Sequence, residues 1–216
     1  MNICESDVQK LRSDVKKHMS EKRYEHTVGV ESTAEKLADY CLPEKKTALR
    51  CAALLHDISK ELSDEEQIAI LKRVDGIVES DLLSPPAHHA FTAPTLIKRD
   101  FPLHATDEIL SAVFNHTTGA EDMSVFDEII FISDYVEPGR KYIDCINVRE
   151  KLFAALSSAT DREECVMRLH EAVIEALNNT INSLIKREMY INERTVAARN
   201  SLLGKLPMPL KGLGEN

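Results

Sequence analysis

Apolar residues recur at helical spacing along almost the whole chain, and the sequence lacks the alternating apolar and polar runs that would indicate strands. This pattern predicts helices over residues 6–19, 23–40, 48–57, 64–71, 88–97, 106–116, 126–134, 147–156, 161–185 and 192–203. The segment 81–87, which contains Ser84-Pro85-Pro86, is expected to be a loop. The expected fold class is therefore all-α, a helical bundle with a C-terminal helical extension.

Several predicted helices are preceded by residue types that cap helix ends. Ser63 followed by Glu66 forms a capping box, and Thr106 is an expected N-cap. No internal repeat, low-complexity tract or linker divides the sequence. We therefore predict one domain over residues 1–203, followed by a flexible tail over 204–216 that glycine and proline interrupt.

The chain of 216 residues is 43% hydrophobic, which is enough for a substantial core. Its net charge of −9 argues against nucleic-acid or anionic-membrane partners, because both need a positive surface. Five cysteines without a CxxC pair are typical of reduced thiols, and no apolar run approaches the ~20 residues of a transmembrane helix. Since the N-terminal residues also lack the pattern of a signal peptide, the sequence predicts a soluble, cytoplasmic protein.

Residue types that bind metals stand at the polar ends of several apolar stripes. They are His26, His56, Asp57, His89, His116 and Asp134. Taken alone, each residue is more often a hydrogen-bonded core or helix-end residue than a metal ligand. Their shared placement at the ends of apolar stripes nevertheless predicts that they converge in space. Buried imidazoles and carboxylates need compensation, which an arginine or lysine partner or a divalent cation can supply. The number of groups suits two divalent cations, which would leave positions for water and substrate. Mixed nitrogen and oxygen donors favour iron, manganese, cobalt or zinc over calcium, and magnesium is a less natural alternative.

The order of these residues resembles a known signature. His26, His56-Asp57 and Asp134 are similar to the H…HD…D pattern of the HD-domain metal-dependent phosphohydrolases, an all-α superfamily. Longer strings resemble its bacterial YqeK group: Arg23-Tyr24-Glu25-His26-Thr27, Leu54-Leu55-His56-Asp57, His116-Thr117-Thr118-Gly119, Ser133-Asp134-Tyr135-Val136-Glu137-Pro138-Gly139-Arg140 and Arg194-Thr195-Val196-Ala197-Ala198-Arg199-Asn200. The resemblance extends over residues 8–203, nearly the whole chain.

This resemblance implies an enzyme that cleaves diadenosine tetraphosphate symmetrically into two ADP through a dimetal-activated hydroxide. By the same resemblance, Asp57 would bridge two divalent ions. The first ion would also bind His26, His56 and Asp134, and the second would bind His89 and His116. Iron is the favoured metal. A dinucleoside polyphosphate would be the substrate, an ADP- or GDP-like molecule the product, and a homodimer is compatible with the resemblance.

Cationic and hydroxyl side chains near this pattern are the candidates for contact with phosphate. Arg140 follows the last metal-ligand helix, and Lys60 follows the His-Asp pair by one turn. With Asp57 they are the predicted catalytic residues, and both cations are also predicted to bind substrate. Thr117 and Thr118 could donate hydrogen bonds to phosphate oxygens, or only end the helix after His116. The competing explanation for Arg140 and Lys60 is that both are exposed surface charges without a role in a site.

The chain departs from the family pattern at two places. Ala90-Phe91 replaces a usual Gly-Pro after the third histidine, so His88 competes with His89 for the ligand role. Asn192-Glu193 stands where the family has His-Pro.

Two other functions stay open. Another HD-domain phosphohydrolase, acting on (p)ppGpp, a deoxynucleoside triphosphate or a cyclic nucleotide, would keep the metals and change the substrate. A non-catalytic domain that binds a metal or a nucleotide would keep the ligands without turnover. Base preference is open as well, with Tyr135 and Phe91 as the candidates for contact with a base.

Overall fold

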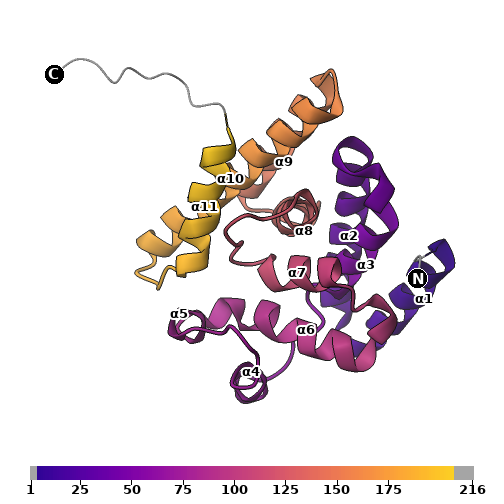
Figure 1. Cartoon of the computed structure of the whole chain (residues 1–216), viewed down its shortest axis with the longest axis vertical. Helices are drawn as coiled ribbons and strands as arrows, with labels where there is room; N and C mark the ends of the chain where they lie inside the picture. Colours follow the sequence, from indigo (N-terminus) through magenta and orange to yellow (C-terminus); the bar gives the residue numbers. More distant parts are fainter. Residues whose placement is uncertain (1–3, 207–216) are drawn as a thin grey trace.

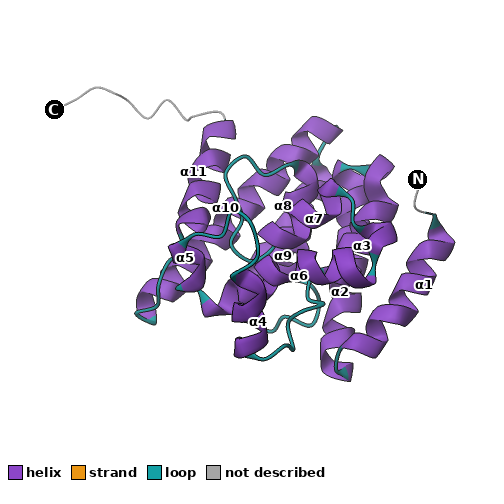
Figure 2. Cartoon of the chain, turned by 60° about the horizontal axis from the view of Figure 1, so that its bottom comes forward, coloured by secondary structure: helices purple, strands orange, loops and turns teal. Residues whose placement is uncertain are grey.

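The computed structural model describes residues 4–206, and every regular element within that range is helical, as the apolar pattern predicts. The α-helices are α1 (Glu5–Val15), α2 (Glu21–Cys41), α3 (Lys46–Leu55), α4 (Asp64–Leu71), α5 (Glu79–Leu82), α6 (His88–Asp100), α7 (Asp107–Asn115), α8 (Val125–Val136), α9 (Ile143–Ser158), α10 (Arg162–Lys186) and α11 (Glu193–Lys205). Short 3₁₀ helices are η1 (Lys16–His18), η2 (Pro43–Lys45), η3 (Pro85–Ala87) and η4 (Pro102–His104). Figure 2 shows these helices and their loops without a strand over the described residues. None of the helices in this range has the length and apolar character needed to cross a membrane.

Short polar residues determine where many of the helices begin. Their side chains accept a hydrogen bond from a backbone N–H of the first helical turn at Ser20, Ser63, Thr106, Ser124, Asp161 and Asn192. Each such cap contributes about 1 kcal/mol to stability. The capping box predicted at Ser63 and Glu66 and the N-cap predicted at Thr106 are therefore confirmed.

Helix α2 lies at the centre of the fold. It packs along α3, α8 and α10, and α7 packs against both α3 and α8. Figure 1 shows α8 nearly end-on between α2, α7 and the C-terminal helices, which agrees with its burial on almost every side. The long helix α10 contacts α8, α9 and α11, so the last three helices form the predicted C-terminal extension.

A continuous hydrophobic cluster extends from Val8 to Leu202 and draws on α1, α2, α3 and α6 to α11. Each large apolar side chain that it buries contributes about 1.5–3 kcal/mol through removal from water. Because the apolar stripes of α2, α3, α7 and α8 all face this core, the polar residues at their inner positions face one another. The packing of the core thus brings the ends of separate helices together.

Some observed boundaries differ from the predicted ones. Within the expected loop 81–87, residues 81–82 are the end of α5 and residues 85–87 form η3, and α6 continues to Asp100 although Pro94 interrupts its backbone hydrogen bonds. Burial of Phe91 and Ile97 against the interior outweighs that loss. Helix α11 continues to Lys205, two residues beyond the predicted end of the domain, and the rest of the predicted tail from residue 207 lies outside the described residues.

Candidate functional site

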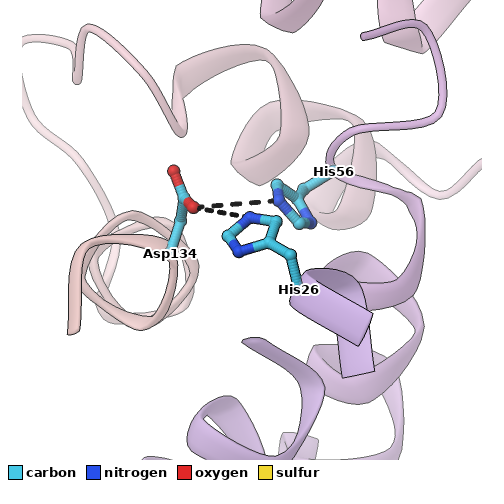
Figure 3. A group of neighbouring side chains, drawn as sticks. All are labelled: His26, His56 and Asp134. Atoms are coloured by element: carbon cyan, nitrogen blue, oxygen red, sulfur yellow. Dashed lines mark ion pairs between the residues drawn. The ribbon is translucent and has the colours of Figure 1, made fainter. Parts of the chain in front are cut away.

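Imidazole and carboxylate side chains from separate helices meet at one largely buried point, which we call the His/Asp cluster. Its members are His26 of α2, His56 and Asp57 directly after α3, His89 of α6, His116 directly after α7, and Asp134 of α8. Donor atoms of His26, His56 and Asp134 all lie within 4.8 Å of one another, and Figure 3 shows both rings directed at this carboxylate. Donor atoms of His56, Asp57 and His116 also lie within 4.8 Å of one another. The structure therefore brings together the residues that the sequence predicts as ligands.

The Asp57 carboxylate lies between two sets of imidazoles, one at each of its oxygens. Its Oδ2 lies 3.4 Å from His56 Nε2 and 3.7 Å from His26 Nε2. Its Oδ1 lies 3.2 Å from His89 Nε2 and 3.6 Å from His116 Nε2. Burial opposes ionisation, but the surrounding histidines hold the pKa of Asp57 well below its usual range. Asp57 is therefore a carboxylate at neutral pH.

The ends of two helices orient His56 and His116 in the same way. His56 Nδ1 lies 2.6 Å from the Ala53 carbonyl oxygen, and His116 Nδ1 lies 2.6 Å from that of Val113. These carbonyls belong to the last turns of α3 and α7, where they lack a partner within the helix. Because a carbonyl oxygen can only accept, Nδ1 donates in both rings. Each Nε2 is left with a lone pair directed at the cluster.

Two buried nitrogen atoms of the cluster are unsatisfied by the protein itself. Over residues 4–206, Nε2 of His26 and Nε2 of His56 have no hydrogen-bond partner, although Asp134 Oδ1 lies 3.0 Å from His26 Nε2. Unpaired buried polar atoms are rare, and one explanation for them is an ion that completes the site. Imidazole nitrogens and carboxylate oxygens suit divalent transition-metal ions. The residues present therefore fit divalent metal binding.

Glu137, which the sequence pattern does not single out, orients His26 from outside the cluster. It directly follows α8 and is buried, and its Oε1 lies 3.1 Å from His26 Nδ1. The Gly139 backbone N–H donates to its other oxygen at 2.5 Å. Burial lowers the pKa of His26, but the carboxylates of Asp134 and Glu137 outweigh burial and raise this pKa to about 9. In the sequence, the only indication of a role for Glu137 is that it lies within the motif that ends at Arg140.

His89 and Lys60 form the opposite side of the cluster. His89 Nδ1 lies 3.0 Å from Lys60 Nζ. Burial lowers the pKa of His89 to about 4, so its ring is neutral and suited to metal binding at pH 7. Burial also lowers the pKa of Lys60. His88 faces away, with its Nε2 3.2 Å from the Leu82 carbonyl oxygen, so the structure brings His89 and not His88 to the cluster.

Two arginines neutralise the carboxylates of the cluster. Arg23 Nη1 lies 2.6 Å from Asp57 Oδ2. Arg140 pairs through Nη2 with Asp134 Oδ1, and its Nε donates to the Asp134 backbone carbonyl at 2.9 Å. Both arginine side chains are partly exposed, so they line the open side of the cluster. Arg140 was predicted from the sequence, whereas Arg23 was given no role although it stands one helical turn before His26.

The remaining candidates lie in different surroundings. Thr117 Oγ1 lies 3.2 Å from His89 Nε2, at the edge of the cluster. Thr118 is buried and donates its hydroxyl to the Gly119 carbonyl, so this hydroxyl is not directed at the cluster. Phe91 is fully buried beside Phe114, so the prediction that it contacts a base is wrong.

Asn192, which stands where the family has histidine, has a structural position. Its side-chain oxygen caps α11, and its Nδ2 donates to Asp81 Oδ1 at 3.1 Å and to the Ser80 carbonyl at 3.2 Å. Arg194 also pairs with Asp81, at 2.9 Å. These contacts tie α11 to the end of α5, where the predicted loop begins.

The substitution Gly29→Ala tests the orientation of His26 by Glu137. A Cβ atom at position 29 would lie 2.6 Å from Glu137 Oε2, so the carboxylate must move away from His26. We expect metal affinity to fall by about 10–100-fold, as for other losses of a residue that orients a ligand. Helical propensity favours alanine by about 1 kcal/mol, which offsets the disturbed hydrogen bond between Glu137 Oε2 and the Gly139 backbone N–H, so thermal stability of the metal-free protein should change little.

Calorimetric metal titration and thermal denaturation would measure these two effects separately. The matched control is Gly204→Ala, because a Cβ at this helical glycine meets no atom within 4 Å. Equal metal affinity of the Gly29 variant and the wild type would contradict the role of Glu137.

Metal uptake by the metal-free protein should increase with pH. His26 must lose a proton before its Nε2 can bind a cation, and its pKa is raised to about 9. Affinity should therefore rise by about tenfold per pH unit from pH 7 and level off near pH 9, with release of one proton. Titration with Mn²⁺ followed by electron paramagnetic resonance would measure this dependence. Constant affinity between pH 7 and 9 would show that His26 is not protonated.

Comparison with known proteins agrees with this geometry. The family model described as HD domain matches residues 23–139, which include every ligand candidate. The symmetrical bis(5′-nucleosyl)-tetraphosphatase of Halalkalibacterium halodurans is 34% identical over 192 residues, which are 88% of this chain and 93% of that protein. The Bacillus subtilis protein of the same name is 31% identical over 191 residues, 88% of this chain and 94% of that one.

A solved structure is similar over nearly the whole chain. It is the crystal structure of a predicted HD superfamily hydrolase involved in NAD metabolism from Clostridium acetobutylicum, with a TM-score of 0.78 and 28% sequence identity. The match covers 95% of this chain and 100% of that one. The helical fold, the His/Asp cluster and these similarities together show that the chain belongs to the HD domain family.

Proposed function

We propose that this protein is a symmetrical bis(5′-nucleosyl)-tetraphosphatase, which hydrolyses diadenosine tetraphosphate to two molecules of ADP with divalent metal ions. Two relatives that carry this enzyme name are more than 30% identical and align over most of both chains. The His/Asp cluster supplies the donor atoms that a metal-dependent phosphohydrolase needs.

The single observation that supports a two-metal site best is the position of Asp57. One carboxylate oxygen faces His26 and His56, and the other faces His89 and His116. A carboxylate with imidazoles at both oxygens can be shared by two ions. We therefore propose that Asp57 is the shared ligand. Asp134 would complete the first ion's ligand set.

The cations, when bound, would lower the pKa of a water molecule and offset negative charge on the phosphates. The protein's own groups then have distinct tasks. Arg140 and Arg23, on the open side, would hold phosphate oxygens through their planar guanidinium groups. Lys60, beside His89, would add positive charge on the opposite side. Thr117 would donate its hydroxyl to a phosphate oxygen.

One water molecule is consumed for each central phosphoanhydride bond that breaks. The oxygen of water bonds to one of the two inner phosphorus atoms, and the bridging oxygen leaves with the other half. Both products are then ADP, because two phosphates remain on each side. The positive charge of Arg140 would stabilise the negative charge that develops on the leaving half.

Mixed imidazole and carboxylate donors suit iron, manganese, cobalt or zinc, with magnesium as a less natural alternative, and the family resemblance favours iron among them. A cytoplasmic location is supported by the free cysteines, and a homodimer stays a prediction. Elemental analysis of the purified protein would identify the metal, and light scattering would give the oligomeric state.

The decisive experiment is product analysis. The metal-loaded protein is incubated with diadenosine tetraphosphate, and the nucleotides are separated by anion-exchange chromatography. We expect ADP as the sole product. ATP together with AMP would indicate asymmetrical cleavage and contradict the proposal. Turnover of (p)ppGpp, a deoxynucleoside triphosphate or a cyclic nucleotide in place of diadenosine tetraphosphate would favour another HD-domain hydrolase.

A further inference from the structure

A large groove opens beside the His/Asp cluster. One wall is the N-terminal half of α2, and the other is the segment 137–142 that links α8 to α9. Its volume is ≈ 1130 Å³, and His26 and Arg140 lie on its surface. The groove is thus continuous with the open side of the cluster and has room for a nucleotide, since sites for small molecules usually occupy about 300–1,000 Å³.

The charge of the groove suits an anion. Lys22 and Arg23 line the α2 wall, and Arg140 and Lys141 line the wall opposite. Over residues 4–206, neither Lys22 nor Lys141 has an acidic partner within ion-pair distance, although the chain as a whole carries a net charge of −9.

The acidic groups of the groove do not cancel this charge. Glu137 also borders the groove, but its carboxylate is held by His26 and by the Gly139 backbone N–H. Glu25 is the other acidic residue on the surface of the groove. Two of the four cations, Arg23 and Arg140, pair with carboxylates of the cluster, so Lys22 and Lys141 supply the charge that Glu25 alone opposes. A diphosphate placed here would have positive charge on both sides.

Tyr142 provides an aromatic surface in the lining of this groove. It follows Lys141, and its side chain is 75% exposed, the largest exposure among the large apolar and aromatic residues of the described chain. Exposed aromatic rings are the usual surfaces on which bases stack. Two residues of chain span at most about 7 Å, so Tyr142 lies within about a nucleotide's length of Arg140.

A second hollow near the cluster is less suitable for a diphosphate. It lies between the link from α5 to α6 and the start of α11, where Thr117 and Tyr190 contribute to its lining. Its volume is only ≈ 120 Å³, and the described residues that line it carry no charged side chain. Phosphates placed there would lose hydration without a compensating cation.

We propose that the groove between α2 and the segment 137–142 binds one nucleoside diphosphate half of the substrate. Its phosphates lie between Lys22 and Lys141, and its base stacks on Tyr142. This inference rests on the proposed function for the identity of the substrate. It goes further by assigning a subsite to residues outside the His/Asp cluster. Tyr142 thereby contributes affinity for one end of the substrate.

Calorimetric binding of ADP and of inorganic pyrophosphate to the metal-loaded protein tests the subsite directly. In Tyr142→Ala, ADP affinity should fall by about tenfold, as expected for loss of one stacked base. Pyrophosphate has no base, so its affinity should not change. In Lys141→Ala, the affinities for both ligands should fall. Tyr142→Phe keeps the ring and should restore ADP binding.

Steady-state kinetics give a second readout. With diadenosine tetraphosphate, Tyr142→Ala should raise KM by about tenfold and leave kcat within twofold of the wild type, because the ring binds but does not react. The matched control is Ile143→Ala, which removes an exposed neighbouring side chain that does not line the groove. This control should match the wild type in every assay.

The outcomes separate the subsite from the enzyme activity. If the wild type forms ADP from diadenosine tetraphosphate while Tyr142→Ala binds ADP normally, the groove proposal is wrong and the proposed function stands. If the wild type binds ADP in a manner that depends on Tyr142 but does not cleave this substrate, the function is wrong and the site stands. If ADP affinity falls about tenfold in Tyr190→Ala but not in Tyr142→Ala, the base lies in the smaller hollow and the proposal is overturned.

Discussion

Replacement of Asp57 by alanine should abolish hydrolysis of diadenosine tetraphosphate and reduce bound metal while the helical fold persists. The carboxylate is the only group of the cluster with imidazoles at both oxygens, so its removal affects both proposed ions. Loss of a single charge-stabilising group costs about 10²–10³-fold in kcat, and loss of a shared ligand should cost at least that much. Turnover assays, elemental analysis and circular dichroism would measure the three effects.

The control for this experiment is Asp100→Ala. Asp100 lies at the end of α6 and pairs with its neighbour Arg99, away from the cluster. If Asp57→Ala does not fold, Asp57→Asn keeps the shape of the side chain and removes its charge. Retained activity in either folded Asp57 variant would contradict the proposed role of this residue.

Replacement of Arg140 by alanine should lower kcat/KM by about 10²–10³-fold, within the range observed for loss of one transition-state donor. The guanidinium lies on the open side of the cluster, where it can hold a phosphate oxygen with two donors. Metal content should be nearly unchanged, because Arg140 contacts Asp134 but supplies no ligand atom. Kinetics combined with elemental analysis would show whether activity falls without metal loss.

Two further variants make the Arg140 result specific. Arg140→Lys keeps the charge and should recover only part of the activity, because an ammonium group lacks the paired donors of a guanidinium. Arg168→Ala removes an exposed arginine that pairs with Glu164 and Glu171 on α10, and should have no effect. Unchanged kcat and KM in Arg140→Ala would remove this residue from the site. Loss of metal in proportion to activity would assign it to the orientation of Asp134.

The sequence was most informative where local chemistry decides the structure. Ser63 and Thr106 cap helices as predicted, because a capping hydrogen bond forms within a single helical turn. Prediction was poorer where distant contacts decide. The end of α5 extends into the expected loop, where Asn192 and Arg194 hold Asp81 from more than a hundred residues away. Phe91 was a candidate for base contact, but packing of α6 buries it completely.

The candidate ligands show the same division. Their residue types and their places at the ends of apolar stripes were enough to nominate His56, Asp57 and His116. Sequence spacing could not distinguish His88 from His89, because both adjacent residues lie in the first turn of α6. The packing of α6 directs His89 at Asp57 and His88 at the Leu82 carbonyl. Glu137 was missed because its role depends on contact with His26, which belongs to another helix.

By itself, the sequence determined the all-helical class, most of the helices and the residue types that meet at the cluster. These follow from hydrophobic periodicity and from polar residues at helix ends, which act over a few residues. Only the tertiary structure decided which oxygen of Asp57 faces which histidine, that Glu137 holds His26, and that a cationic groove leads from Arg140 to Tyr142. The physical reason is that orientation of a side chain depends on how helices distant in the sequence pack against one another, and that packing is a property of the whole core.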